Sequence, residues 1–208
     1  MFKYVGDISK ISHYIIDQFL ENKNIAIDAT LGNGYDTDFL SPKFTKVYSF
    51  EIQEEACKNY SERKNENVIV INKSHHLLKR YVTEESVDCI MYNLGFLPGG
   101  NKKITTMSET SLNSIIEGLE LLNRGGLMTI CLYRGHVQGK EEESVIIPYL
   151  KDLPKSKFGV MYHEFLNRSK EAPILIVVEK KWIILLNIIL WRYTWETWIY
   201  KKMIIIKN

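Results

Sequence analysis

A glycine-rich turn between a short apolar run and a helix-forming segment constrains this chain most strongly. Residues 25–40 read IAIDATLGNGYDTDFL, in which the apolar start is typical of a buried strand and the segment from Tyr35 to Leu40 can begin a helix. Gly32 and Gly34 permit positive φ and present no Cβ to an incoming ligand. The segment therefore predicts a strand, a tight turn and a helix that bring backbone N–H groups to one ligand-binding point.

The charges around this turn indicate which ligand it binds. A dinucleotide fingerprint has a third glycine where this chain has Thr37. The carboxylates of Asp28, Asp36 and Asp38 would repel a pyrophosphate, but they suit the cationic amino and sulfonium groups of S-adenosylmethionine. A second predicted strand ends at Glu51, whose carboxylate can accept hydrogen bonds from both ribose hydroxyls. The alternative is an ordinary tight turn beside a solvated carboxylate.

The composition fits one α/β domain. The chain has 208 residues, 45% of them hydrophobic, and a formal net charge of +2, so any contact with nucleic acid must be a local basic patch. Three widely spaced cysteines without a C-x-x-C pair predict reduced core thiols and no metal site. The N-terminus lacks a long apolar region, so we expect no secretory signal and a cytoplasmic protein.

Seven strand-like runs predict the sheet. Five of them alternate with helical segments and occupy residues 25–29, 47–53, 67–71, 86–92 and 127–133. Two more, over 158–166 and 174–179, have no helix between them, which predicts an antiparallel hairpin closing a seven-stranded, mostly parallel, doubly wound sheet with helices on both faces. A leading helix is expected to turn one face to the sheet and to carry His13 and Asp17 on or beside the other. That inward face comprises Ile8, Ile11, Ile15, Ile16, Phe19 and Leu20.

The second stretch with chemical interest directly follows the fourth strand. Residues 93–100 read NLGFLPGG. An Asn side-chain carbonyl and the next backbone carbonyl can accept two amine hydrogens and so aim the nitrogen lone pair at a methyl group. Phe96 can stack on a base or exclude water. These residues predict methyl transfer to an amine; the alternative is a strand that ends in a turn with a core phenylalanine.

Polar residues also follow the third and fifth strands, where parallel sheets bind ligands. Ser74 can cap the helix that follows it and is succeeded by His75. His136 is a candidate base for an alkylammonium substrate, or else a surface histidine. Five basic residues on predicted loops are candidate phosphate contacts, or else plain surface charges: Lys102, Lys103, Arg134, Arg168 and Lys170.

The composition changes sharply after Lys181. Residues 182–191 are apolar but too few to span a bilayer, and charged residues interrupt the sequence from Arg192 onward. We therefore expect a catalytic domain over 1–181, an extension over 182–208 of unassigned role, and no stable membrane association. The extension is either dispensable, which we favour, or an interfacial or partner-binding segment.

Six patterns in order along the chain resemble one family. They are DATLGNGYDT from Asp28, EIQ from Glu51, SH from Ser74, NLGFLP from Asn93, YRGH from Tyr133 and FLNRSKEAP from Phe165. Together they are similar to the YtqB-type S-adenosylmethionine-dependent methyltransferases, also called MnmM and earlier labelled rRNA methylases, over roughly residues 5–181. The resemblance implies a Rossmann-like class I methyltransferase fold. It also implies methylation of 5-aminomethyl-2-thiouridine to 5-methylaminomethyl-2-thiouridine at the tRNA wobble position.

The resemblance implies roles by position. The cofactor-binding residues that the resemblance implies are Asn33, Asp36, Glu51, Gln53, Ser74 and His75. We also predict cofactor contacts at Asp28, Thr30, Gly32, Gly34, Thr37 and Asn93. The implied substrate-facing residues are Asn93, Leu94, Gly95, Phe96, Pro98, Tyr133, Arg134 and His136, with Asn93, Phe96, Tyr133 and His136 at the chemistry. Family members commonly have Asp in place of Glu51, which keeps a carboxylate for the ribose. They commonly have a histidine in place of Arg134, which leaves His136 as the better base.

Two functional alternatives stay open, and so does the assembly. In the first alternative, the chain methylates another RNA base amine, such as one in rRNA. In the second, it is a non-catalytic module that binds S-adenosylmethionine or RNA. The expected partner is the anticodon arm of tRNA. An edge hairpin also offers a surface for a homodimer.

Overall fold

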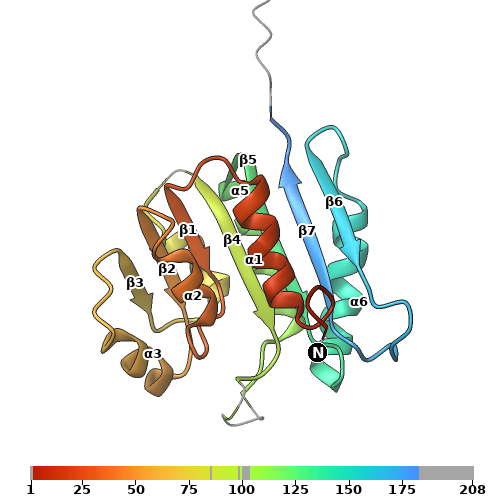
Figure 1. Ribbon diagram of the computed structural model, residues 1–208, viewed down its shortest axis with the longest axis horizontal. Helices are drawn as coiled ribbons and strands as arrows, with labels where there is room; N and C mark the ends of the chain where they lie inside the picture. Colours follow the sequence, from red (N-terminus) through yellow and green to blue (C-terminus); the bar gives the residue numbers. More distant parts are fainter. Residues whose placement is uncertain (1, 85, 98, 100–103, 183–208) are drawn as a thin grey trace, which may run out of the picture.

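The described residues form a three-layer α/β structure (Figure 1). The computed structural model describes residues 2–84, 86–97, 99 and 104–182, so the predictions for Pro98, Lys102, Lys103 and the extension lie outside it. The strands are β1 (Ile25–Asp28), β2 (Lys46–Phe50), β3 (Val68–Ile71), β4 (Val87–Leu94), β5 (Leu122–Leu132), β6 (Phe158–His163) and β7 (Ile174–Lys180). The helices are α1 (Ile8–Phe19), α2 (Tyr35–Leu40), α3 (Glu54–Ser61), α4 (Leu78–Tyr81), α5 (Ser108–Leu121) and α6 (Val137–Lys151), with a 3₁₀ turn η1 (His75–Leu77).

The sheet has the order β3-β2-β1-β4-β5-β7-β6. The first five strands in this order are parallel, and β7 pairs antiparallel with both β5 and β6. This topology confirms the predicted doubly wound sheet and its closing hairpin. Because β1, β2, β4 and β5 are parallel, their carboxyl ends lie at one edge (Figure 1). The strand order reverses between β1 and β4, and such sheets bind ligands at this point of the edge.

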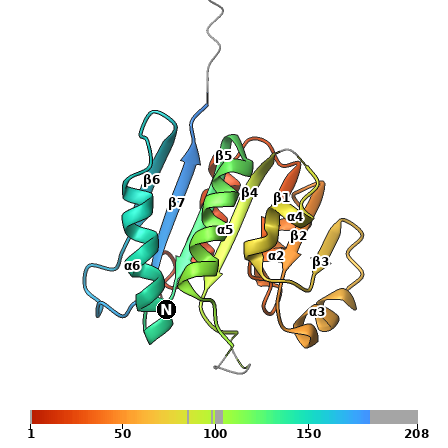
Figure 2. The same cartoon turned by 180° about the vertical axis from the view of Figure 1, so that it is seen from behind.

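Alternate residues of the central strands fill two cores, one on each face of the sheet. Ile27 and Ile90 face the core with α5 and α6, whereas Ala26 and Cys89 face the core with α1 and α2. Figure 2 shows α4, α5 and α6 over the face opposite α1. Burial on both faces explains why the strands read as continuous apolar runs. All three cysteines are free and buried, as predicted.

The helices differ from the predicted stripes in detail. In α1 the buried row is the i, i+4 series Ile8, Ser12, Ile16 and Leu20, whereas Phe19, predicted to face inward, lies beside this row and is 70% exposed. In α5 the buried face includes Gly118, where an added Cβ would lie 2.9 Å from the Met128 side chain. Close approach to the sheet therefore selects small residues that a hydrophobic pattern does not reveal.

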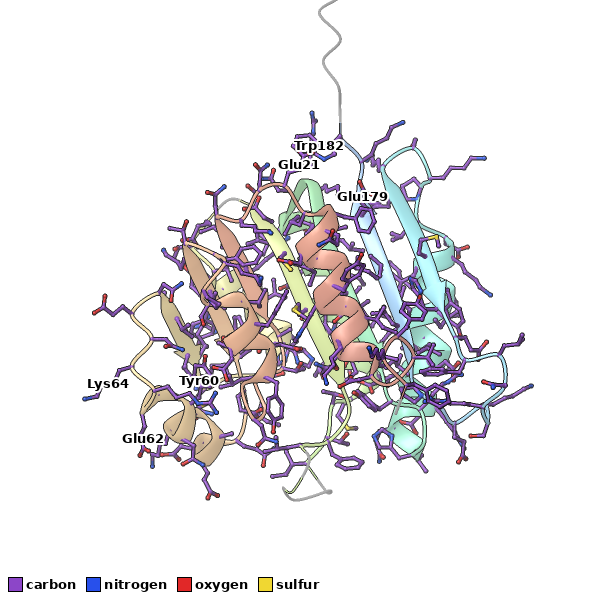
Figure 3. The ribbon with its side chains drawn as sticks, viewed as in Figure 1. Glu21, Tyr60, Glu62, Lys64, Glu179 and Trp182 are labelled. Atoms are coloured by element: carbon purple, nitrogen blue, oxygen red, sulfur yellow. The ribbon has the colours of Figure 1, made fainter. Side chains whose placement is uncertain are left out.

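The described chain ends far from the carboxyl edge. Figure 3 shows Trp182 at the opposite end of the sheet, near Glu179. A Cβ added to Gly125 would lie 2.0 Å from the Trp182 indole, so this ring covers the glycine directly. Trp182, the last described residue, thus lies on the side away from the predicted site. Within the described residues, no helix is long and apolar enough to cross a bilayer.

Candidate functional site

The glycine turn after β1 has the predicted backbone conformation. Gly32 and Gly34 have φ values of 51° and 85°, and the Gly34 N–H donates to the Leu31 carbonyl at 2.7 Å. A Cβ on Gly34 would lie 2.3 Å from the Tyr60 ring. Gly34 is therefore required twice, for its positive φ and for the approach of Tyr60. The Arg63 guanidinium donates to the Asn33 carbonyl at 3.0 Å and braces the turn from outside.

Three of the predicted cofactor residues support this turn from inside. Asp28 is fully buried and accepts hydrogen bonds from the Thr30 N–H at 3.0 Å and the Thr37 hydroxyl at 2.6 Å. Burial, with the nearby Asp36 charge as a second cause, raises the pKa of Asp28 to about 7. Thr37 is also fully buried. The structure thus places Asp28 and Thr37 beneath the turn and gives them the task of shaping it.

Glu51 joins the ends of β1 and β2. Its Oε2 accepts the Gly32 N–H at 3.0 Å and its Oε1 accepts the Gln53 N–H at 2.9 Å. The carboxylate is half-buried, and each oxygen has a further lone pair. Glu51 therefore reaches back to the glycine turn and still offers acceptors to ribose hydroxyls. Gln53 contributes its backbone here and precedes α3 without a side-chain cap.

His75 presents an unused nitrogen beside the same edge. The side chain is 7% exposed, and burial lowers the pKa of His75 to about 4, so the ring is neutral at physiological pH. The ring bonds to the Ala29 backbone, while its Nε2 is buried and has no partner among the described residues. Ser74 does not cap η1 through its hydroxyl, which bonds instead to His76 Nδ1 at 2.9 Å. An unpartnered buried nitrogen fits a ligand group at this position.

Asn93, next to the last residue of β4, lies within a hydrogen-bonded chain. Its N–H donates to Thr30 Oγ1 at 2.8 Å, and its Oδ1 accepts from Ser9 Oγ at 3.2 Å. Its Nδ2 donates to Asp36 Oδ2, and Asp36 Oδ1 lies 2.7 Å from His13 Nε2. Sequence reasoning missed Ser9 and placed His13 on or beside the outer face of its helix. The i, i+4 spacing of Ser9 and His13 puts both on one face of the helix, and this was the sequence signal that could have grouped them.

The segment after Asn93 is tied into the sheet. The Leu94 carbonyl accepts the Tyr133 N–H and the Gly95 carbonyl accepts the Thr106 N–H, both at 3.1 Å. The Leu94 carbonyl, predicted as the second acceptor for an amine, therefore already receives one backbone hydrogen bond. Phe96 and Tyr133 stay 37% and 40% exposed at the edge of the site. The two aromatic rings are thus partly open to solvent near the tip of β4.

His136 is arranged as a hydrogen-bond donor. It caps α6, and its Nδ1 accepts the Gly139 N–H at 2.8 Å. A neutral imidazole with Nδ1 as acceptor carries its hydrogen on Nε2. This Nε2 is buried, has no partner among the described residues, and lies near Gly95 and the Phe96 ring. This arrangement favours a hydrogen-bond donor at this point over the predicted base.

Arg134 is turned away from the site. Its side chain is 5% exposed and pairs with Glu143 at 2.6 Å and Glu164 at 2.5 Å. Its Nε also donates to the Ala172 carbonyl at 2.9 Å. The guanidinium therefore links α6 to the β6–β7 connection. We withdraw it as a phosphate contact, because its hydrogen bonds are used within the protein.

The β6–β7 connection carries the other two described basic candidates. Arg168 is exposed, lies 3.8 Å over the Phe165 ring and donates to the Val5 carbonyl at 3.0 Å. Lys170 is also exposed. Both residues thus keep charge available to solvent, and Arg168 lies against the N-terminal segment. Residues 2–84, 86–97, 99 and 104–182 contain no cluster of three or more His, Cys, Asp or Glu side chains that could hold a metal ion.

A separate cavity of about 820 Å³ lies between α6 and β6. Its lining is mostly apolar and includes Ile147, Phe158 and Ile176. Of the Arg134 partners, Glu143 and Tyr162 reach its wall. The residues predicted for the cofactor and the amine lie elsewhere, at the carboxyl edge, so this cavity is not the candidate site.

Comparison with known proteins gives concordant matches. A family model described as "Putative rRNA methylase" matches residues 47–179. The "tRNA (mnm(5)s(2)U34)-methyltransferase, chloroplastic" of Arabidopsis thaliana is 31% identical over 190 residues, which cover 83% of this chain and 69% of that protein. An rRNA methylase structure from Clostridium thermocellum has a TM-score of 0.79 and 32% identity. A methyltransferase from Streptococcus mutans, solved with SAH, has a TM-score of 0.76 and 35% identity. Each structural match covers 86% of this chain and 99% of the other.

Proposed function

This chain belongs to the family described as putative rRNA methylases, the YtqB or MnmM type, and from this premise we propose its reaction. It is an S-adenosylmethionine-dependent N-methyltransferase that converts 5-aminomethyl-2-thiouridine to 5-methylaminomethyl-2-thiouridine at the tRNA wobble position. The observation that carries this proposal is Asn93 at the tip of β4, with its Nδ2 fixed on Asp36 and its Oδ1 left as the acceptor. An acceptor at this point suits an amine substrate.

The carboxyl edge fits the cofactor. The turn has positive φ at Gly32 and Gly34, Glu51 offers carboxylate lone pairs to the ribose, and His75 offers a buried nitrogen without a described partner. These three groups come from the ends of β1, β2 and β3, which are neighbours in the sheet. When bound, S-adenosylmethionine supplies a methyl group on a sulfonium for in-line displacement. The SAH in the Streptococcus mutans relative supports the same cofactor here.

The protein's own contribution to transfer is positioning. One Asn93 Oδ1 lone pair accepts from Ser9, and the other remains for an amine hydrogen, which fixes the direction of the nitrogen lone pair. Phe96 and Tyr133 cover the reacting groups and exclude water. The His136 Nε2–H donates to an acceptor on the substrate base, which satisfies a buried donor. The amine attacks in its neutral form, after its ammonium has released a proton to solvent, and orientation and desolvation account for the rest of the catalysis that we propose.

The partner is tRNA, and we propose that its anticodon arm docks at the carboxyl edge. The name of the Arabidopsis relative supports tRNA as substrate. Arg168 and Lys170 are the described candidates for phosphate contacts, and Lys102 and Lys103 stay predictions outside the described residues. The free, buried cysteines suit a reducing compartment, in line with a cytoplasmic reaction.

Two further features belong to the proposal. β6 is an edge strand with exposed Val160, Met161 and Tyr162, which suits pairing with a second copy of the chain. The methyltransferase domain ends near Lys181, because β7 completes the sheet at Lys180. The extension beyond it is not needed for the reaction.

Nucleoside mass analysis tests the function. The purified chain is incubated with S-adenosylmethionine and tRNA from cells that lack this activity, with rRNA from the same cells as the matched alternative substrate. We expect a gain of one methyl group on 5-aminomethyl-2-thiouridine in the tRNA. If only the rRNA gained a methyl group, rRNA would replace tRNA as the substrate. If neither RNA gained a methyl group while the cofactor was bound, the proposed catalytic function would be wrong.

A further inference from the structure

Helix α1 reaches both ends of the Asn93 amide. Ser9 and His13 are one helical turn apart and therefore project from the same face of α1. Ser9 donates to Asn93 Oδ1 at 3.2 Å. His13 Nε2 lies 2.7 Å from Asp36, which in turn accepts from Asn93 Nδ2. In Figure 1 this helix lies in front of β5, between β4 and β7. α1 precedes the segment that the family model matches, residues 47–179.

The chemistry of these partners fixes which way the Asn93 amide points. A carboxylate only accepts hydrogen bonds, so the group facing Asp36 must be the NH₂ of the amide. The carbonyl oxygen then faces Ser9, whose hydroxyl donates to it. An amide flipped by 180° would set its oxygen against the Asp36 carboxylate and lose that hydrogen bond, and only its NH₂ would then face the Ser9 hydroxyl. The pair of contacts thus selects the single orientation that leaves Oδ1 toward an amine.

His13 keeps Asp36 in place for this task. Asp36 is 3% exposed, and a buried carboxylate needs donors or an opposite charge. His13 supplies the Nε2 donor, and its ring stacks on Phe39 with centroids 4.0 Å apart and planes 3° apart. The stacked ring cannot rotate freely, so it holds the carboxylate at a fixed point. Both Asp36 oxygens are engaged, one by His13 and one by Asn93.

We propose that Ser9 and His13 are positioning residues for methyl transfer, with Ser9 acting directly on Asn93 and His13 acting through Asp36. This inference rests on the proposed function, since Asn93 holds the amine in that reaction. It assigns α1 a role in turnover in addition to covering the sheet. It also makes Asp36 a support for Asn93, where the resemblance implied a cofactor contact.

Kinetics of four variants test this role. His13→Ala removes the donor, His13→Gln restores an N–H at similar reach, Ser9→Ala removes the direct contact, and Tyr14→Ala is the control at a 62% exposed position of the same helix. We expect kcat to fall about thirtyfold in His13→Ala and about fivefold in Ser9→Ala, because small misplacements of positioning groups slow reactions up to about a hundredfold. His13→Gln should recover to within about threefold of the parent, and calorimetric cofactor affinity should change less than about threefold. His13→Ala turning over like Tyr14→Ala, or His13→Gln as slow as His13→Ala, would overturn the inference.

The side-chain amide of Asn93 gives a readout that needs no turnover. In ¹⁵N-labelled protein its signal is identified by its loss in Asn93→Asp. His13→Ala should shift this signal and speed hydrogen exchange of the Nδ2 protons about tenfold, with recovery in His13→Gln. An unchanged signal in folded His13→Ala overturns the positioning chain, whatever the RNA substrate. A parent that shows this coupling but methylates no RNA would overturn the proposed function alone.

Discussion

The tips of β4 and β5 are neighbours in one sheet, yet their polar residues do opposite things. At the β4 tip, Asn93 meets one carboxylate and one hydroxyl and keeps an acceptor lone pair for a ligand. At the β5 tip, Arg134 meets two carboxylates and a carbonyl and is 5% exposed. Position at a strand end places a side chain near the site. The charges of the neighbouring side chains decide whether it stays available to a ligand or stabilises the fold.

Replacing Arg134 should have the largest effect on stability. Arg134→Met keeps much of the buried volume but leaves Glu143 and Glu164 without their cation. We expect a loss of about 3 kcal/mol in the free energy of unfolding by urea. Arg168→Met, at an exposed site on the same connection, is the control and should change it by less than about 0.5 kcal/mol. If Arg134→Met kept the stability of the parent but bound tRNA more weakly, Arg134 would again be a candidate phosphate contact.

At the tip of β1, Asp28 is a buried acid that is not paired with a cation among the described residues. The pKa of Asp28 is raised from 3.8 to about 7 by burial, so the folded state binds a proton that the unfolded state releases. Stability therefore falls as pH rises through this window, by about 2 kcal/mol between pH 5 and pH 7. Asp28→Asn should flatten this part of the curve in chemical denaturation. A parent whose stability rises between pH 5 and pH 7, with Asp28→Asn unchanged in slope, would contradict the burial argument.

His136 combines both kinds of role in one side chain, since its Nδ1 caps α6 and its Nε2 is proposed to contact the substrate. His136→Asn keeps an acceptor near the position of Nδ1 for the Gly139 N–H but removes the Nε2 donor. We expect kcat/KM for tRNA to fall about tenfold, since one unsatisfied hydrogen bond costs on the order of 1 kcal/mol. Thermal stability should stay near that of the parent, whereas His136→Ala should lose the cap as well. Full activity in His136→Asn would show that Nε2 does not touch the substrate.

The end of the sheet opposite both tips should matter least. A chain that ends after Trp182 keeps the ring that covers Gly125 and lacks only residues 183–208. We expect its free energy of unfolding and its cofactor affinity to match the full chain within about 0.5 kcal/mol. Calorimetry on both chains checks this. Loss of folding or of cofactor binding would make the extension part of the domain.

The sequence predicted the sheet because its central strands are buried on both faces and therefore read as apolar runs. It also predicted the glycine turn, since Gly32 and Gly34 do adopt positive φ. The sequence did not predict the directions in which individual side chains point. Ser9 and Asn93 are 84 residues apart, so their contact depends on how α1 crosses the sheet. The His136 proton depends on one backbone N–H, and the burial of Arg134 depends on Glu143 and Glu164.

The central claim is that Asn93 holds the amine for transfer, and single-turnover methylation of tRNA by Asn93→Ala tests it most directly. The rate is measured with saturating cofactor, beside calorimetric affinity for S-adenosylmethionine on the same sample. We predict a rate about a hundredfold below the parent, with cofactor affinity within about threefold, because the contact acts on the amine in the transition state. A parental rate in folded Asn93→Ala would contradict the claim.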